Sequence, residues 1–163
     1  MNQPNHDANK VVTPFIRNVA GWTIIELMIV TAIIAILSGV SISQYKNYKE
    51  RIRVSQAIVD IAVASTLIGQ YYVKHGDYPS DLSEVAGGRV DPWGRDYVYV
   101  NLTAFQGKGK ARKDRKLNPL NSDFDLYSVG KDGATKIQIS NRDSLDDVLR
   151  ANDGAFIDLA SKF

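Results

Sequence analysis

The feature that most constrains this chain is a run of 19 predominantly apolar residues from Trp22 to Val40, with one charged side chain, Glu26. As an α-helix the run would be about 28 Å long, close to the thickness of the hydrocarbon core of a bilayer. We therefore interpret it as a membrane-spanning helix. Because a carboxylate inside such a helix costs about 2.5–3.5 kcal/mol to insert, Glu26 is a candidate functional residue.

Three interpretations of this run are open. A secretory signal peptide would have a shorter apolar core, of about 7–15 residues, that ends at small residues. A simple membrane anchor would place Glu26 near the start of the helix, where its side chain could reach the interface. The third interpretation depends on the residues that precede and begin the helix, GWTIIELMIV from Gly21 to Val30.

The segment GWTIIELMIV resembles the prepilin cleavage and methylation segment shared by type IV pilins and type II secretion pseudopilins. The shared pattern is a glycine, an aromatic residue, Thr, two aliphatic residues, Glu and a long apolar run. The resemblance implies that a prepilin peptidase cuts between Gly21 and Trp22 and methylates the new amine of Trp22, where the family usually has Phe. It also implies that Glu26 acts in assembly, by pairing with the α-amine of a neighbouring subunit.

Composition limits the remaining possibilities. The 163 residues suffice for one membrane helix and one small domain, and 44% apolar with 23% charged residues is typical of a folded chain. A net charge of +2 gives no reason to expect a nucleic-acid partner. The sequence has no cysteine, which excludes disulfides and thiolate metal sites. A small extracytoplasmic domain then needs another means of stabilisation, and a bound metal is one.

We expect the membrane helix to continue as an amphipathic helix. No proline occurs between Phe15 and Tyr78, and apolar residues recur at spacings of three and four through the second half. The stripe consists of Val54, Ala57, Ile58, Ile61, Ala64, Ile68, Tyr71 and Tyr72. A single helix from about Trp22 to about Lys74 resembles the long N-terminal helix of pilins, although Ser43 stands where pilins often carry a proline.

The rest of the chain is expected to form a small β domain. Asp81 and Glu84 have the spacing of a capping box for a short helix. The turn Asp-Pro-Trp-Gly at 91–94, which resembles the major pseudopilin, precedes an alternating run that predicts a strand. Two more strands are expected in FDLYSVGKDG and TKIQIS, residues 124–133 and 135–140, before an acidic tail.

The predicted fold is therefore α+β, with a long N-terminal helix packed on a small antiparallel β-sheet and a C-terminal acidic loop. We divide the chain into a leader peptide at 1–21, a transmembrane segment at 22–41, an amphipathic continuation of the helix at 42–75 and a periplasmic globular β domain at 76–163.

A basic loop occupies residues 101–122. Its basic side chains are Lys108, Lys110, Arg112, Lys113, Arg115 and Lys116, opposed by Asp114. We interpret the loop as solvated; the alternatives are contact with an acidic neighbouring subunit or with a polyanion such as DNA. Its one aromatic residue, Phe105, gives little support for stacking on single-stranded bases, so we do not expect a nucleic-acid partner.

Four carboxylates are candidate metal ligands. Asp125 and Asp132 flank the turn in DLYSVGKDG, and a hairpin could bring Asp146 and Asp147 beside them. Clustered loop oxygens are the ligands that Ca²⁺ takes, although the spacing is not that of an EF-hand. DLYSVGKDG followed by an Asp-Asp-aliphatic triplet resembles the calcium loop of the major pseudopilin of type II secretion. The resemblance implies calcium in place of the disulfide of many type IV pilins; here, however, about a dozen residues separate the Asp-Asp pair from the turn.

No phosphate-binding glycine loop, nucleophile elbow or H-E-x-x-H motif occurs in the sequence, so we do not expect an enzyme. The resemblance implies a subunit of a type II secretion pseudopilus, a homopolymer that works as a periplasmic piston for protein export. Its implied partners are the prepilin peptidase, minor pseudopilins and the inner-membrane assembly platform. The alternative is a type IV pilin that forms an extracellular fibre for adhesion, motility or DNA uptake.

The expected location is the inner membrane, crossed once, with the globular domain in the periplasm. A count of basic residues opposes this orientation, because the basic residues that follow the transmembrane segment outnumber those in the leader. They are Lys46, Lys49, Arg51 and Arg53 after the helix, and Lys10 and Arg17 before it. We follow the prepilin-like motif, which is the more specific signal.

Overall fold

The computed structural model describes residues 21–104 and 108–163. The predicted leader lies outside the described residues, except for Gly21. The chain divides into two compact units, with the boundary between Ile42 and Ser43.

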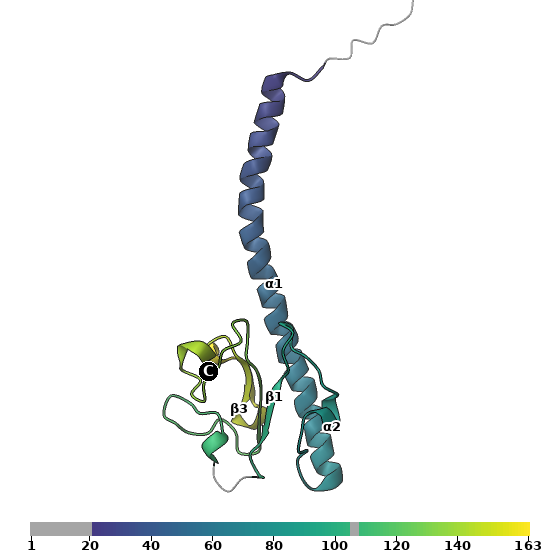
Figure 1. Cartoon of the computed structure of the whole chain (residues 1–163), viewed down its shortest axis with the longest axis vertical. Helices are drawn as coiled ribbons and strands as arrows, with labels where there is room; N and C mark the ends of the chain where they lie inside the picture. The colour runs from purple at the N-terminus through teal and green to yellow at the C-terminus, as the bar shows by residue number, and fades with distance from the viewer. Residues whose placement is uncertain (1–20, 105–107) are drawn as a thin grey trace, which may run out of the picture. The chain divides into compact units, whose positions relative to one another are not determined.

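Helix α1 extends from Ile24 to His75 (Figure 1), which confirms the prediction of one long N-terminal helix. Among the described residues it is the one helix long and apolar enough to cross a membrane. In the first unit its apolar side chains are exposed, with Ile24 at 81% and Leu27 at 60%. The hydroxyls of Thr31 and Ser38 donate to the carbonyls of Met28 and Ile34, so these polar groups are satisfied within the helix, as a lipid environment requires.

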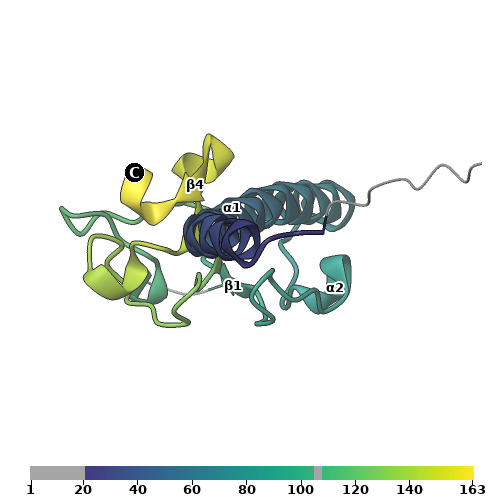
Figure 2. The same ribbon diagram turned by 90° about the horizontal axis from the view of Figure 1, so that it is seen from above.

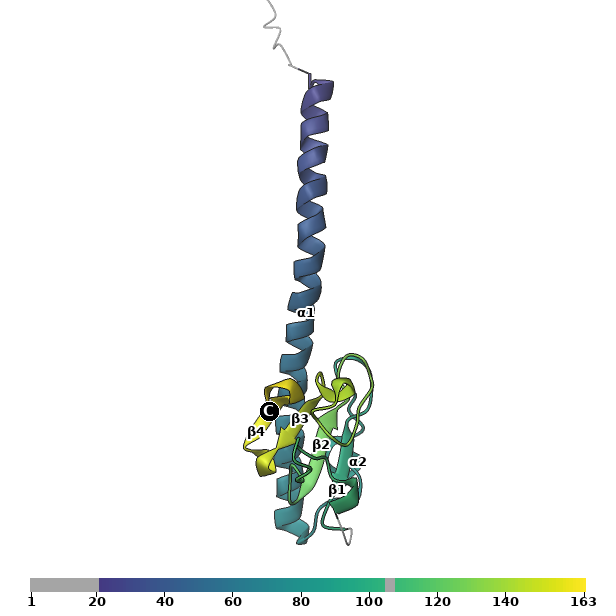
Figure 3. The same ribbon diagram turned by 90° about the vertical axis from the view of Figure 1, so that its left-hand side faces the viewer.

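The second unit contains a four-stranded antiparallel sheet in the order β1-β2-β3-β4 (Figure 3). Its strands are β1 (Val98–Asn101), β2 (Phe124–Ser128), β3 (Val148–Ala151) and β4 (Phe156–Leu159). The short helix α2 (Ser83–Ala86) and strand β4 lie toward opposite edges of this unit (Figure 2). Four 3₁₀ helices complete the described elements: Lys108–Lys110, Arg142–Ser144, Asn152–Gly154 and Ala160–Lys162.

The core of this unit lies between α1 and the sheet. The predicted stripe supplies the helical side of the core through Ala57, Ile61, Ala64 and Ile68, all of them buried. The strands supply Phe124, Leu126 and Val148. Full burial of a side chain such as Ile61 or Ile68 stabilises the fold by about 1.5–3 kcal/mol, so the stripe holds the helix against the sheet.

Two predictions about the local structure have different outcomes. The capping box is confirmed, because Glu84 Oε1 accepts the backbone N–H groups of Ser80 and Asp81 ahead of α2. The strand predicted at residues 135–140 is wrong, because the backbone there bonds to the basic loop: Lys113 donates to Ile137 and accepts from Ile139. These groups therefore cannot join the main sheet.

The last two strands come instead from the segment that the sequence analysis treats as an acidic tail. β3 and β4 form a hairpin in which Val148 lies opposite Leu159. The turn between them, Asn152 to Gly154, has positive φ at all three residues, at 52°, 54° and 97°. Asn, Asp and Gly are the residues that tolerate this region of backbone space.

Candidate functional site

Thr23 and Glu26 close the first turn of α1. The backbone N–H and the hydroxyl of Thr23 donate to Glu26 Oε2 at 2.8 and 2.9 Å, and the Glu26 N–H donates to Thr23 Oγ1 at 3.3 Å. This reciprocal pairing is a capping box, which satisfies amides that a helix start leaves free. This capping box was not predicted, although its Thr-x-x-Glu spacing is readable in TIIE, residues 23–26. Glu26 therefore has a local role in addition to the predicted role in assembly.

The predicted cleavage position lies directly before this turn. Gly21 and Trp22 precede α1 and belong to no helix or strand, and the Trp22 side chain is 78% exposed. Exposed segments outside regular structure are the ones that proteases reach. Cleavage between these residues stays a prediction.

The four carboxylates predicted to bind calcium form two separate pairs. Asp146 Oδ2 accepts the N–H groups of Lys131 and Asp132 at 2.8 and 3.0 Å, and Asp132 Oδ1 accepts the Ala134 N–H at 2.8 Å. This pair therefore holds the tight turn after β2.

The other pair, Asp125 and Asp147, is buried around Arg112. Asp125 Oδ2 accepts the Arg112 backbone N–H at 2.7 Å, and Asp147 Oδ2 lies 2.6 Å from Arg112 Nη2. Burial raises the pKa of both carboxyl groups. Hydrogen bonds from the Arg112 backbone N–H and from Asn121 oppose the rise at Asp125, and the positive charge of Arg112 opposes it at Asp147.

These residues do not fit a calcium site as the structure places them. Asp125 and Asp147 already bond to Arg112, and Asp132 and Asp146 already bond to backbone N–H groups. In residues 21–104 and 108–163, no three His, Cys, Asp or Glu side chains are grouped so that they could hold a metal ion. Calcium remains a prediction from the sequence.

The turn at Asp91–Gly94 is joined to the segment that follows β2. Asp91 Oδ1 accepts the N–H groups of Trp93 and Arg95, and Asp91 Oδ2 accepts the hydroxyl of Ser128 at 2.5 Å. Arg95 donates to the carbonyls of Gly130 and Lys131 at 2.6 and 3.1 Å. The two segments that resemble the major pseudopilin are therefore in direct contact, although more than 30 residues separate Asp91 from Ser128.

A second link ties the same turn to α1. Trp93 Nε1 donates to Glu50 Oε1 at 3.0 Å, across 43 residues of sequence. Trp93 also packs against the main core as a partly buried side chain. The turn thus connects the helix with the end of β2.

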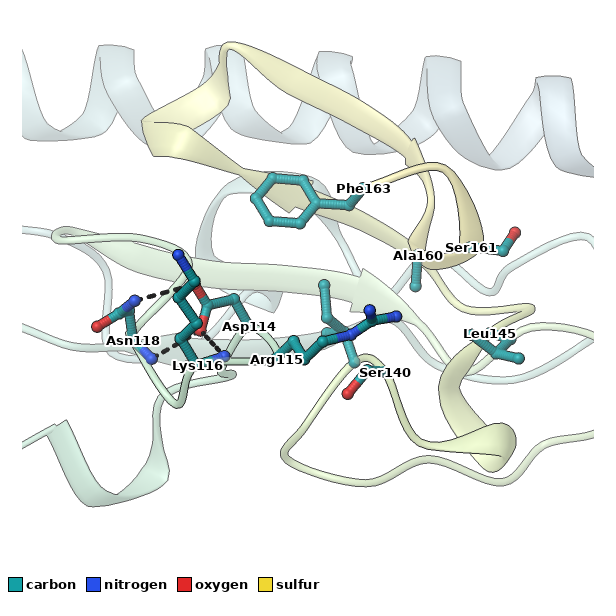
Figure 4. Close-up of a pocket in the computed structure, with 10 residues that line it drawn as sticks. Asp114, Arg115, Lys116, Asn118, Ser140, Leu145, Ala160, Ser161 and Phe163 are labelled. Atoms are coloured by element: carbon teal, nitrogen blue, oxygen red, sulfur yellow. Dashed lines mark hydrogen bonds between the residues drawn. The ribbon is translucent and has the colours of Figure 1, made fainter.

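A cavity of about 510 Å³ lies beside the basic loop (Figure 4). Its lining residues are Asp114, Arg115, Lys116, Asn118, Ile139, Ser140, Leu145, Ala160, Ser161 and Phe163. Asp114 is bonded to Asn118 and Lys116 within the loop, and the Asn118 hydrogen bonds hold the pKa of Asp114 below its usual range. The lining contains no His, Cys or second acidic side chain to act with Asp114, so the cavity gives no support for acid–base catalysis.

Comparison with known proteins finds a fimbrial protein and a type II secretion protein that are similar to this chain. The chain is 29% identical over 147 residues to the fimbrial protein of Neisseria meningitidis serogroup A, covering 86% of this chain and 84% of that protein. It is 27% identical over 139 residues to the type II secretion system core protein G of Pseudomonas aeruginosa, covering 72% of this chain and 87% of that protein. The relatives found are thus type IV pilins and a type II secretion pseudopilin, the two groups that the N-terminal segment resembles.

The similarity to these relatives agrees with the resemblance carried by GWTIIELMIV and with the α+β fold. A shorter match of higher identity, 43% over 61 residues, links the chain to the type IV major pilin protein PilE of Neisseria gonorrhoeae, covering 37% of this chain and 36% of that protein. Neither a protein-family model nor a solved structure matches the chain. This pilin-like chain carries a helix of membrane-spanning length and composition at its N-terminal side.

Proposed function

We propose that this protein is a structural subunit of a type II secretion pseudopilus. It is anchored in the inner membrane by the first part of α1, with the globular domain in the periplasm, and it polymerises into a short filament that acts as a piston in protein export. The observation that carries this proposal is the contact between the two pseudopilin-like segments, Asp91–Gly94 and Asp125–Gly133. Asp91 accepts the Ser128 hydroxyl, and Arg95, directly after the turn, bonds to the second segment. The similarity to core protein G over 87% of its length supports the same role.

The exposed apolar face of α1 supports a role in assembly rather than catalysis. Burying a side chain such as Ile36, which is 70% exposed, is favourable by about 1.5–3 kcal/mol. Lipid covers this face in the membrane, and neighbouring subunits cover it in the filament. The partners that we propose are further copies of this chain, minor pseudopilins, the prepilin peptidase and the inner-membrane assembly platform.

A type IV pilin is the second candidate. It is favoured by the alignment with the meningococcal fimbrial protein, which covers 84% of that protein. In this role the chain would form an extracellular fibre for adhesion, motility or DNA uptake. The same helix and sheet would serve both filaments.

Deletion of the gene in its native host separates the two candidates. For a pseudopilin we expect proteins that are normally exported to accumulate in the periplasm, while surface fibres, twitching motility and DNA uptake stay normal. Mass spectrometry of culture supernatants and electron microscopy of the cell surface measure the two outcomes. Loss of surface fibres with normal export would establish the pilin instead, and a plasmid-borne copy of the gene is the control in both cases.

The first prediction concerns processing. We expect the mature protein to begin with an N-methylated Trp22, because the segment around Gly21 has the pattern that prepilin peptidases cut. Intact-mass measurement of protein from cells with and without the peptidase tests this. Removal of a different number of residues, or an unmodified amine at Trp22, contradicts the prediction.

A further inference from the structure

Arg112 belongs to the basic loop, but its side chain is buried inside the protein. Its exposed fraction is 3%, whereas Arg115 and Lys116, from the same loop, are exposed. An arginine is almost never buried unless it is paired, so the groups around Arg112 explain its position.

The Arg112 side chain joins three segments that are distant in sequence. Nη2 donates to Asp147 Oδ2 at 2.6 Å, and Nη1 donates to Thr135 Oγ1 at 2.7 Å. The guanidinium also lies over the ring of Tyr127 in β2, 4.1 Å from its centroid. Thr135 in turn donates to Asp147 Oδ2 at 2.7 Å, so the three polar groups form a closed network.

The backbone of Arg112 makes a fourth connection. Its N–H donates to Asp125 Oδ2 at 2.7 Å, while Asn121 donates to Asp125 Oδ1 at 2.9 Å. Its carbonyl accepts the Leu120 N–H at 2.9 Å. Arg112 thus contacts two of the four predicted calcium ligands, Asp125 and Asp147, which are 1% and 0% exposed.

The chemistry of this network is that of a cation held by oxygen atoms, with the chain itself as the source of the cation. A Ca²⁺ ion would need six to eight oxygen ligands around an open centre. Here Asp147 Oδ2 accepts one guanidinium N–H, from Arg112 Nη2, in the short geometry of a charge-assisted hydrogen bond, while Asp147 Oδ1 and Arg112 Nε have no hydrogen-bond partner among the described residues. Such a pair needs no metal to neutralise the buried carboxylate.

We propose that the Arg112 guanidinium is an internal cation that closes the C-terminal region of this protein, in place of the calcium that the pseudopilin resemblance implies. It connects the basic loop with β2, with Thr135 and with Asp147, which directly precedes β3. A bound metal or a disulfide would otherwise connect these segments. The basic loop supplies the residue that makes the metal unnecessary. The inference holds for a pseudopilus and for a pilus alike, so its failure would leave the proposed function untouched.

The first test measures hydrogen exchange of the full chain in detergent micelles, in calcium and in excess chelator. We expect peptides that cover 111–121 and 146–151 to exchange at rates that agree within about twofold, because no metal contributes to their protection. A calcium site filled at a hundredfold excess over its Kd would slow their opening by roughly 100-fold. Slowing of about tenfold or more in calcium overturns the proposal.

The second test compares matched substitutions in one loop, Arg112→Met and Arg115→Met, in chelator. We expect Arg112→Met to speed exchange in 146–151 by about tenfold or more, because it leaves the buried carboxylate of Asp147 without its partner. Arg115→Met removes an exposed charge and should exchange like the wild type. Equal exchange in the two variants overturns the proposal.

A double variant keeps the proposal testable if Arg112→Met fails to fold. Combining Arg112→Met with Asp147→Asn removes both charges, and removal of a whole buried pair is less damaging than removal of one partner. We therefore expect slower exchange in 146–151 for the double variant than for Arg112→Met alone. If the double variant gains no protection, the charge pair is not what closes the region.

Discussion

Replacing Glu26 by alanine is expected to prevent filament assembly while leaving membrane insertion, cleavage after Gly21 and folding of the globular domain intact. A carboxylate in lipid needs a partner, and cleavage creates one, the α-amine of Trp22. In a filament of staggered helices, the carboxylate of one subunit can meet the amine of the next. The attraction between the carboxylate and the amine is strongest where both charges are out of water. Loss of the carboxylate should therefore weaken assembly rather than folding.

The capping box at the start of α1 offers a competing explanation for any assembly defect, because alanine also removes the bonds between Glu26 and Thr23. Glutamine separates the two explanations. Glu26→Gln keeps an oxygen that can accept the Thr23 N–H, as capping boxes with Gln do, but it carries no charge. We expect Glu26→Gln to fail in assembly as Glu26→Ala does.

The measurement is the amount of sheared, pelletable filament from cells in which the variant is the only copy. We expect a loss of at least about tenfold for both variants, equivalent to about 1.4 kcal/mol or more in the assembly equilibrium. Intact mass and membrane fractionation check that cleavage and insertion are normal. Wild-type filament yield from Glu26→Gln, together with loss in Glu26→Ala, would assign Glu26 to capping and remove the charge pair from the mechanism.

Most of the features that could be predicted from the sequence depend on residues that are close together in the chain. The middle of the predicted stripe, including Ile61 and Ile68, is buried as its periodicity predicts, whereas Tyr72 at its end is exposed. Helical spacing alone decides which side chains share a face. The box formed by Asp81 and Glu84 could be found for the same reason, since its partners are three residues apart. The turn of the β3–β4 hairpin, Asn-Asp-Gly at 152–154, is also a local pattern, although it was not predicted.

The buried arginines could not be predicted, because their partners lie far away in the sequence. Arg112 bonds to Asp147 across 35 residues. Arg150 bonds to Asp123 across 27 residues, with its guanidinium 3.9 Å from the centroid of the Phe124 ring. Taken alone, a basic residue in a polar loop or in a short strand indicates a solvated side chain. Only the packing of distant strands shows that these two are internal, and for the same reason the sequence alone assigned Asp125 and Asp147 to a metal rather than to an arginine.

Gly130→Ala is expected to destabilise the globular domain by about 3 kcal/mol, through backbone strain and a clash together. Gly130 has a φ of 66°, and a Cβ added there would lie 2.3 Å from the carbonyl oxygen of Asp146 and 2.7 Å from its carbonyl carbon. The Asp146 backbone cannot move aside cheaply, because its own side chain holds the N–H groups of Lys131 and Asp132. The clash therefore forces apart the turn after β2 and the segment that leads into β3.

Gly87 provides the matched control for this effect. Its φ of 64° is nearly the same, but a Cβ added there would meet nothing within 4 Å. Gly87→Ala should therefore cost only the backbone strain, about 1–2 kcal/mol. Urea unfolding of the full chain in detergent micelles, followed by near-ultraviolet circular dichroism, measures both variants against the wild type. Equal losses of unfolding free energy in the two variants would mean that the Asp146 backbone yields to the new methyl group. The contact between the turn after β2 and the segment around Asp146 would then not limit the stability of the domain.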